Sequence, residues 1–116
     1  MKVIVAGGRD FRDWGLLSAT LDKEKDLIDE IVCGEAKGTD LAGKHWAELN
    51  DIPVTSFCAD WGMYGNSAGP IRNKEMANYA DYLIAFWDGK SRGTKNMIEE
   101  MRRAGKHGKV IFYEKS

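Results

Sequence analysis

The sequence has little of what would mark a secreted, membrane-bound or nucleic-acid-binding protein. Its 116 residues include two cysteines and two prolines, and the formal net charge at pH 7 is −1. The cysteines form no Cys-x-x-Cys pair and no disulfide framework, so we expect Cys33 and Cys58 to be buried thiols. A charge so near zero argues against nucleic acid or an acidic membrane as a partner. No apolar run suits a membrane span or a signal peptide, so we expect a cytoplasmic protein.

Short apolar runs alternate with amphipathic segments along the chain. The runs have the length of β-strands and lie at residues 2–6, 28–33, 53–57, 82–87 and 110–113. Strands that alternate with helices imply right-handed crossovers and a parallel sheet covered on both faces. The sequence therefore predicts one domain over residues 1–116. Its fold class is α/β: a Rossmann-like three-layer sandwich with a five-stranded, mainly parallel sheet and helices on both faces.

Glycine-rich loops follow these strands, at residues 7–8, 34–38, 62–69 and 89–93. The carboxyl ends of parallel strands meet at one edge of the sheet, where ligands bind at the switch in strand order. Gly34 and Gly38 allow the backbone to approach a ligand closely, and the first turn of the following helix attracts anions. A plain turn capped by Thr39 or Asp40 would explain that loop equally well. The convergence of all four loops favours a small-molecule site.

Four further features concern the loops and helices around this site. The loop Gly7-Gly8-Arg9-Asp10-Phe11 departs from Gly-x-Gly-x-x-Gly, which argues against a standard nicotinamide dehydrogenase. Residues 59–70 are predicted to be one long irregular segment, whose Trp61 and Tyr64 could stack on a base or pack across a subunit boundary. Pro70 is predicted to lie in the first turn of the next helix. His45 lies on the apolar face of the preceding helix and is expected to be packed or partly buried.

Four motifs in order resemble the SLOG superfamily over nearly the whole chain. The segment Gly34-x-Ala36-x-Gly38-Thr39-Asp40 is similar to the Gly-x-Ala-x-Gly-x-Asp signature of these Rossmann-like domains, which include DNA-processing protein A and the lonely-guy phosphoribohydrolases. The other motifs resemble a small YpsA-related branch found in bacteria and phages. They are Gly7-Gly8-Arg9-Asp10-Phe11, Ala68-Gly69-Pro70-Ile71-Arg72-Asn73 and Ser91-x-Gly93-Thr94.

The resemblance implies that the chain binds a nucleotide or a nucleotide-derived small molecule, as a sensor or ligand-binding domain. The loops at 34–40 and 91–94 would hold phosphate and ribose. The expected ligand-binding residues are Gly7, Gly8, Arg9, Asp10, Gly34, Ala36, Gly38, Thr39, Asp40, Trp61, Arg72, Asn73, Asp88, Ser91, Gly93 and Thr94. No resident cofactor or metal site is predicted, although Asp40 and Asp88 could bind Mg²⁺ carried by a ligand's phosphates. A homodimer or higher homo-oligomer is expected.

Two alternatives stay open. The first is a phosphoribohydrolase that cleaves the N-glycosidic bond of a nucleoside monophosphate, with Arg72, Asp40 and Glu35 as its catalytic residues. In lonely-guy enzymes a glutamate occupies the position of Met97, and the helical stripe places Glu99 opposite the core and Glu100 at its flank, so neither replaces it. The second alternative is an oligomerising scaffold domain without a ligand.

Overall fold

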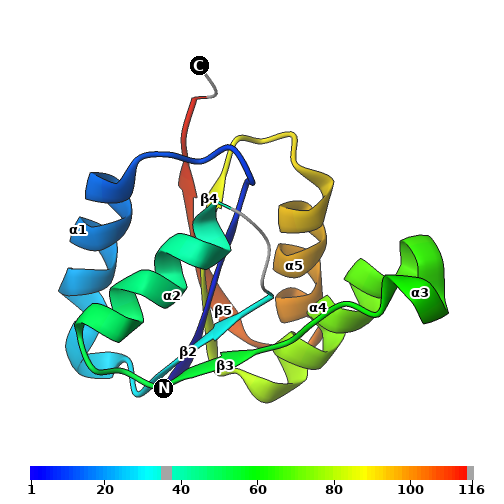
Figure 1. Ribbon diagram of the computed structural model, residues 1–116, viewed down its shortest axis with the longest axis horizontal. Helices are drawn as coiled ribbons and strands as arrows, with labels where there is room; N and C mark the ends of the chain where they lie inside the picture. The colour runs from blue at the N-terminus through cyan, green and yellow to red at the C-terminus, as the bar shows by residue number, and fades with distance from the viewer. Residues whose placement is uncertain (35–37, 115–116) are drawn as a thin grey trace.

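The computed structural model describes residues 1–34 and 38–114, which form a central sheet between two helical layers (Figure 1). The strands are β1 (Lys2–Gly7), β2 (Glu30–Cys33), β3 (Val54–Ser56), β4 (Tyr82–Trp87) and β5 (His107–Phe112). The helices are α1 (Trp14–Glu24), α2 (Thr39–Leu49), α3 (Trp61–Tyr64), α4 (Ala68–Tyr79) and α5 (Arg92–Arg103). Single 3₁₀ turns follow α1 at Lys25–Leu27 and α3 at Gly65–Ser67.

All four strand pairings are parallel, and the strand order is β3-β2-β1-β4-β5. The chain first builds outward from β1 to β3, and then returns to place β4 on the free edge of β1. The order therefore reverses between β1 and β4, and the site-forming edge is the one where these strands end. The strand beginning after Pro53 lies at the edge of the sheet, as its proline predicts. The predicted α/β fold is confirmed.

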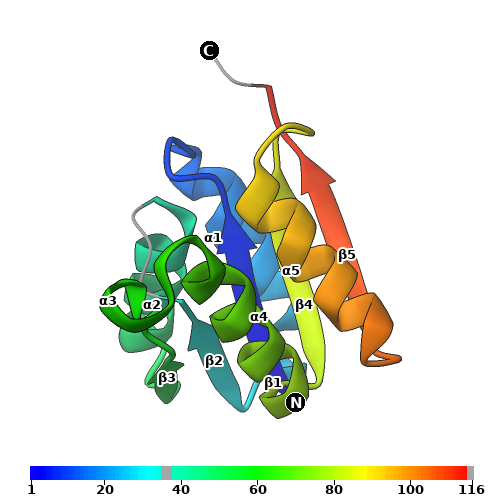
Figure 2. The ribbon, with the colours of Figure 1, turned by 90° about the vertical axis from the view of Figure 1, so that its right-hand side faces the viewer.

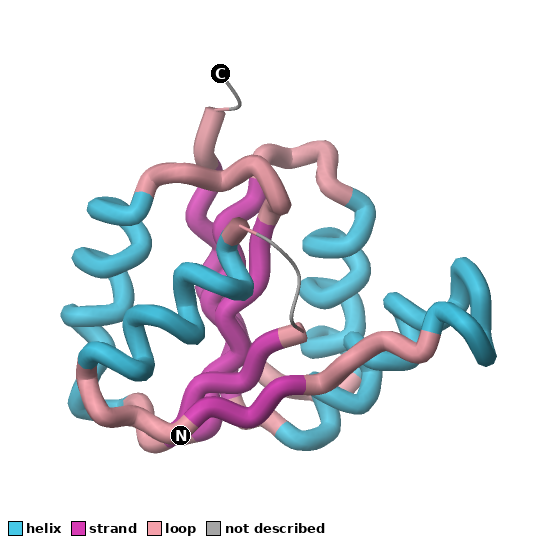
Figure 3. The backbone as a smooth tube through the Cα atoms, viewed as in Figure 1, coloured by secondary structure: helices cyan, strands magenta, loops and turns pink. Residues whose placement is uncertain are grey.

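Alternating residues of the strands supply two separate cores. Val3 and Val5 of β1 face α1 and α2, whereas Ile4 and Ala6 face α4 and α5. Figures 2 and 3 show the two helical layers on opposite faces of the sheet. Since both faces are covered, the central strands need apolar residues at every position, and this explains why they read as unbroken apolar runs.

Three expectations about side chains and boundaries were wrong. The segment 59–70, predicted to be irregular, contains helix α3, whose first turn is capped by the Asp60 carboxylate, and the start of α4 at Ala68, so that Pro70 lies in the first turn of α4 as predicted. His45 is exposed because α2 packs on the sheet through Gly43, Trp46 and Ala47 instead. Cys33 is buried as predicted, but Cys58 is exposed because it lies beyond the end of the edge strand β3. Within the described residues, no helix combines the length and apolar character required to cross a membrane.

Candidate functional site

A cavity of about 660 Å³ opens at the carboxyl edge of the sheet, beside the switch point. Its walls come from the ends of β1 and β2, the segment around α3, and the first turns of α4 and α5. Ten predicted site residues line it: Gly7, Arg9, Gly34, Asp40, Trp61, Arg72, Asn73, Ser91, Gly93 and Thr94. The other lining residues are Ala6, Cys58, Ala59, Asn66, Gly69, Pro70, Met76, Arg92, Asn96 and Met97.

Arg72 connects two of these walls. It stands in the second turn of α4, and its Nη1 donates a 2.7 Å hydrogen bond to the carbonyl oxygen of Gly34 after β2. A Cβ on Gly34 would lie 3.0–3.1 Å from the guanidinium, so the glycine allows the flat group to lie against the backbone. Arg72 Nε is buried and has no hydrogen-bond partner among the described residues. A buried cationic donor without a partner among the described residues is suited to an anionic ligand.

Asp40 is the one carboxylate among the described residues that line the cavity. It lies in the first turn of α2, is only 6% exposed, and its Oδ2 accepts a 3.1 Å hydrogen bond from the Gly34 amide. Asp40 and Arg72 thus hold Gly34 from two sides, one through its N–H group and the other through its carbonyl. This arrangement fixes Gly34 between a carboxylate and a guanidinium.

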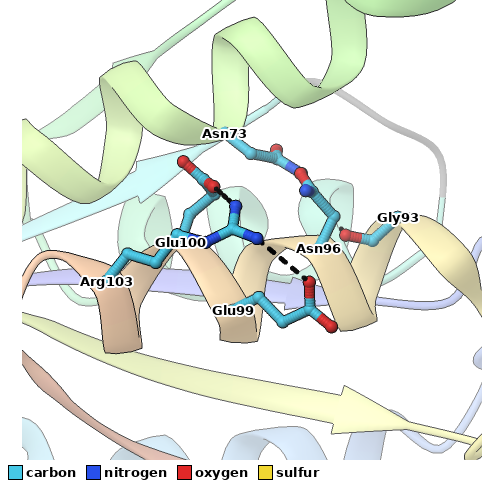
Figure 4. Close-up of polar contacts among 6 residues, drawn as sticks. All are labelled: Asn73, Gly93, Asn96, Glu99, Glu100 and Arg103. Carbon is cyan, nitrogen blue, oxygen red and sulfur yellow. Dashed lines mark hydrogen bonds and ion pairs between the residues drawn. The ribbon is translucent and has the colours of Figure 1, made fainter.

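The first turn of α5 forms the opposite wall. Asn73, which is 5% exposed, donates from Nδ2 to Asn96 Oδ1 at 2.9 Å and to the Gly93 carbonyl at 3.3 Å (Figure 4). These bonds hold α4 against the beginning of α5. The α5 first turn contains no acidic residue, so its N–H groups keep their full attraction for an anion.

The loop before α5 is shaped by Asp88. Its Oδ1 accepts hydrogen bonds from the amides of Lys90 and Ser91, both at 2.8 Å. The Ser91 hydroxyl in turn lies 3.2 Å from that of Thr94, and both residues line the cavity. Asp88 itself is outside the lining, so it positions this loop rather than facing the cavity.

Trp61 supplies an aromatic surface at the α3 end of the cavity. Its side chain is 53% exposed, and a Cβ on Gly69 would lie 3.3 Å from Trp61 Cη2. The indole therefore rests against the α4 backbone at a position where glycine leaves it room. Tyr64, the other aromatic residue singled out from the sequence, is exposed and does not line the cavity.

Gly8, Gly38 and Thr39 were predicted to contact the ligand, but they pack the loops against each other outside the lining. The Thr39 hydroxyl donates to the Gly8 carbonyl at 3.1 Å, and Thr39 is fully buried. Gly38 has φ +76°, and a Cβ there would come within 2.5 Å of the Arg9 carbonyl. These contacts hold the end of β1 against the start of α2.

Asp10 also lies outside the cavity lining, where its Oδ1 accepts a 3.2 Å hydrogen bond from the Tyr113 hydroxyl. Burial, followed by the charge and hydrogen bond of Asp10 and the charge of Asp88, raises the pKa of Tyr113 to about 12. Tyr113 packs edge-on against Phe11, with ring centroids 4.8 Å apart. Asp10 is thus part of the support beneath the β1 loop.

The structure describes some of the residues considered for catalysis and not others. Glu35 and Ala36 lie outside the described residues. Met97 lines the cavity, whereas Glu99 and Glu100 do not; both glutamates instead pair with Arg103 (Figure 4). Across residues 1–34 and 38–114 there is no group of three or more His, Cys, Asp or Glu side chains arranged for a metal ion.

Sequence reasoning missed several lining residues, of which Arg92, Asn96, Asn66 and Cys58 carry polar or reactive groups. Arg92 belongs to the Ser91-x-Gly93-Thr94 motif and could have been found from its position there. Asn96 is one turn further along the same helix, at the spacing that shares a face. Cys58 had no such signal, because its exposure depends on where the edge strand ends. Among the described lining residues, three arginines face one aspartate, so the cavity is cationic.

Comparisons with known proteins are consistent with this architecture. The model of a family described as YAcAr, the YspA, cpYpsA-related SLOG family, matches residues 1–64. The chain is 32% identical over 115 residues to the Gene 61 protein of Mycobacterium phage D29, and the match covers 90% of each chain. DNA processing protein A from Streptococcus pneumoniae has a similar structure, with a TM-score of 0.78 at 18% identity over 94% of this chain. The chain spans about half of that larger protein, 49% of its length.

Proposed function

The chain belongs to the YspA, cpYpsA-related SLOG family, and from this premise we propose that it binds a nucleotide or a nucleotide-derived small molecule in the cationic cavity. The observation that carries the proposal is the buried Nε of the half-buried Arg72, which has no hydrogen-bond partner among the described residues. A partly desolvated arginine with an N–H group that has no partner among the described residues gains most from a phosphate or another multivalent anion.

The cavity offers complementary groups for each part of such a ligand. Phosphate would bind between Arg72 and the first turn of α5, where Ser91 and Thr94 add hydroxyl donors. The half-exposed indole of Trp61 would stack on the base. Asp40 would accept hydrogen bonds from sugar hydroxyls, or meet Mg²⁺ carried by the ligand's phosphates.

N-glycosidic hydrolysis is the second candidate function. The observation that favours it is Asp40, a buried carboxylate in the cavity wall that could stabilise positive charge on a ribose ring. In its disfavour, the lonely-guy glutamate position holds Met97, whose thioether has no acid–base chemistry. Binding without turnover therefore has the stronger support.

The experiment is a thermal-stability screen of the purified protein against nucleoside monophosphates, diphosphates, cyclic dinucleotides and ADP-ribose, followed by chromatography of every mixture. A ligand present at about 100 times its Kd should add about 2.7 kcal/mol to the free energy of unfolding. An intact ligand after a shift supports binding, and free base supports the hydrolase. The absence of any shift across the panel would refute the proposed ligand class.

Three substitutions test the assignment of Arg72. Arg72→Ala should remove most of the ligand-induced shift, whereas Arg102→Ala, an exposed arginine of α5 outside the cavity lining, should leave it unchanged. Gly34→Ala should reduce the shift less than Arg72→Ala does, because its Cβ would lie 3.0–3.1 Å from the guanidinium and would move that group by only a few tenths of an ångström. Equal ligand responses in Arg72→Ala and Arg102→Ala would show that the anion binds elsewhere.

A further inference from the structure

A second surface, away from the ligand cavity, lies on the outer side of α1 and α2. It is an apolar groove of about 760 Å³ whose lining includes Trp14, Leu41, His45 and Leu49. Trp14 is 47% exposed, Leu41 51% and Leu49 72%. Large apolar side chains gathered on one face of a protein mark an interaction site more often than a free surface. We call Trp14, Leu41, His45 and Leu49 the outer apolar face.

The geometry of α2 sets charges beside this face. Leu41, His45 and Leu49 recur every four residues, so they form a stripe along the helix. At 100° per residue, Lys44 and Glu48 lie together on the flank of the stripe that points away from α1. The exposed surface of α2 therefore has an apolar side next to α1 and a flank with one positive and one negative residue.

We propose that a second copy of this chain docks on the outer apolar face, with the two α2 helices antiparallel about a two-fold axis. The two-fold axis is perpendicular to α2 and passes the helix at the level of His45 and Trp46. Rotation about it places the charged flank of the partner's α2 on the same side of the interface as the charged flank of the first α2. The partner's helix runs in the opposite direction. Lys44 then meets Glu48 of the partner subunit, and this pairing occurs twice. Leu41 and Leu49 are exchanged in the same way, so the apolar stripe covers its own counterpart.

The order of the two charges along α2 favours a second copy of the chain as the partner. Lys44 comes before Glu48, so this flank meets opposite charges on an identical flank only when the second helix runs antiparallel. A two-fold axis produces that antiparallel arrangement. Met63 and Tyr64 are also exposed, but they stand on the four-residue helix α3, which has no comparable flank of opposite charges. None of the side chains in the outer apolar face lines the ligand cavity, so this inference is independent of the proposed function.

The test is sedimentation velocity of the full chain over a wide concentration range, with charge-swapped variants. Each of Lys44→Glu and Glu48→Lys sets like charges against each other at two symmetric positions, and should weaken self-association about tenfold. The double variant restores both pairings and should recover the wild-type association. Leu41→Ser combined with Leu49→Ser should abolish it. The matched control Met63→Ser removes an equally exposed side chain elsewhere, and should have no effect.

Three results would overturn the proposal. One is a wild-type protein that stays monomeric at every concentration. Another is a dimer that both leucine substitutions leave intact, or that Met63→Ser dissociates, since either would place the interface on another face. The third is a double variant, Lys44→Glu with Glu48→Lys, that associates as weakly as the single variants. If residue 44 pairs with residue 48 of the partner subunit, the double variant must regain the wild-type association.

Discussion

Gly7→Ala should strongly destabilise the protein, although it adds a single methyl group. A Cβ at this position would lie 2.5 Å from the Phe86 carbonyl oxygen and 2.5 Å from Thr39 Oγ1. Ordinary contact begins near 3.4 Å, so each approach is about 0.9 Å too close. Neither neighbour can withdraw easily, because Phe86 is paired with Gly7 in the sheet and the Thr39 hydroxyl is bonded to the Gly8 carbonyl. Overpacking of this kind costs about 3 kcal/mol.

The loss can be measured by urea denaturation and thermal melting against Gly93→Ala. Gly93 lines the same cavity and stands in the first turn of α5, but a Cβ there meets no atom within 4 Å. Gly93→Ala should therefore be neutral or slightly stabilising, since alanine favours the helix. For Gly7→Ala, a loss of about 3 kcal/mol corresponds to a fall in Tm of about 10 °C in a chain of this size. Equal melting temperatures for the two variants would refute the close packing of β1, β4 and α2.

Three further predictions concern stability. Lys106→Met should lower the free energy of unfolding by about 1–2 kcal/mol, because Lys106 Nζ donates to three carbonyl groups at the end of α4. The control Lys109→Met breaks a 3.6 Å surface ion pair and should change the free energy of unfolding little in the same urea titration. Asn73→Ala should lower the free energy of unfolding by about 1–2 kcal/mol relative to Asn78→Ala at an exposed position, since it removes the hydrogen bonds that join α4 to α5. Equal stability of the two variants in chemical denaturation would contradict this prediction. The pKa of Tyr113 is raised to about 12, so its neutral form favours the folded state, and the Tyr113 contribution to stability should fall as pH rises from 10 to 12. Tyrosinate absorbance should show one late-titrating group that Tyr113→Phe removes, and a titration unchanged by that substitution would contradict the assignment.

The sequence was sufficient for the architecture because the strands are covered on both faces. Every residue from Val3 to Ala6 is buried, so a short unbroken apolar run could only be a central strand. Parallel topology followed from the helical segments between the runs, and it placed the glycine loops on one edge. Arg72 and Asn73 were found there because a motif marks the beginning of their helix.

The details of the site depended on contacts that a linear pattern does not contain. Thr39 stands in a typical phosphate-binding position, but its hydroxyl is used by the Gly8 carbonyl, 31 residues away in sequence. His45 lies within an apolar stripe, but the side of α2 that meets the sheet is decided by Gly43, where a Cβ would lie 2.9 Å from the Val5 side chain. Which residue of a helix faces the core is set by the neighbouring strand, and spacing alone leaves several choices.

The central position of β1 has a consequence for how the chain is synthesised. β1 is the first of the five strands to leave the ribosome, yet one of its two edges is paired only with β4, which begins at Tyr82. Until then the nascent chain carries an apolar strand with unpaired backbone groups, a state that favours aggregation. The same late arrival brings α5, whose first turn completes the cavity wall. The chain should therefore be most prone to aggregation during the interval of synthesis between β1 and β4.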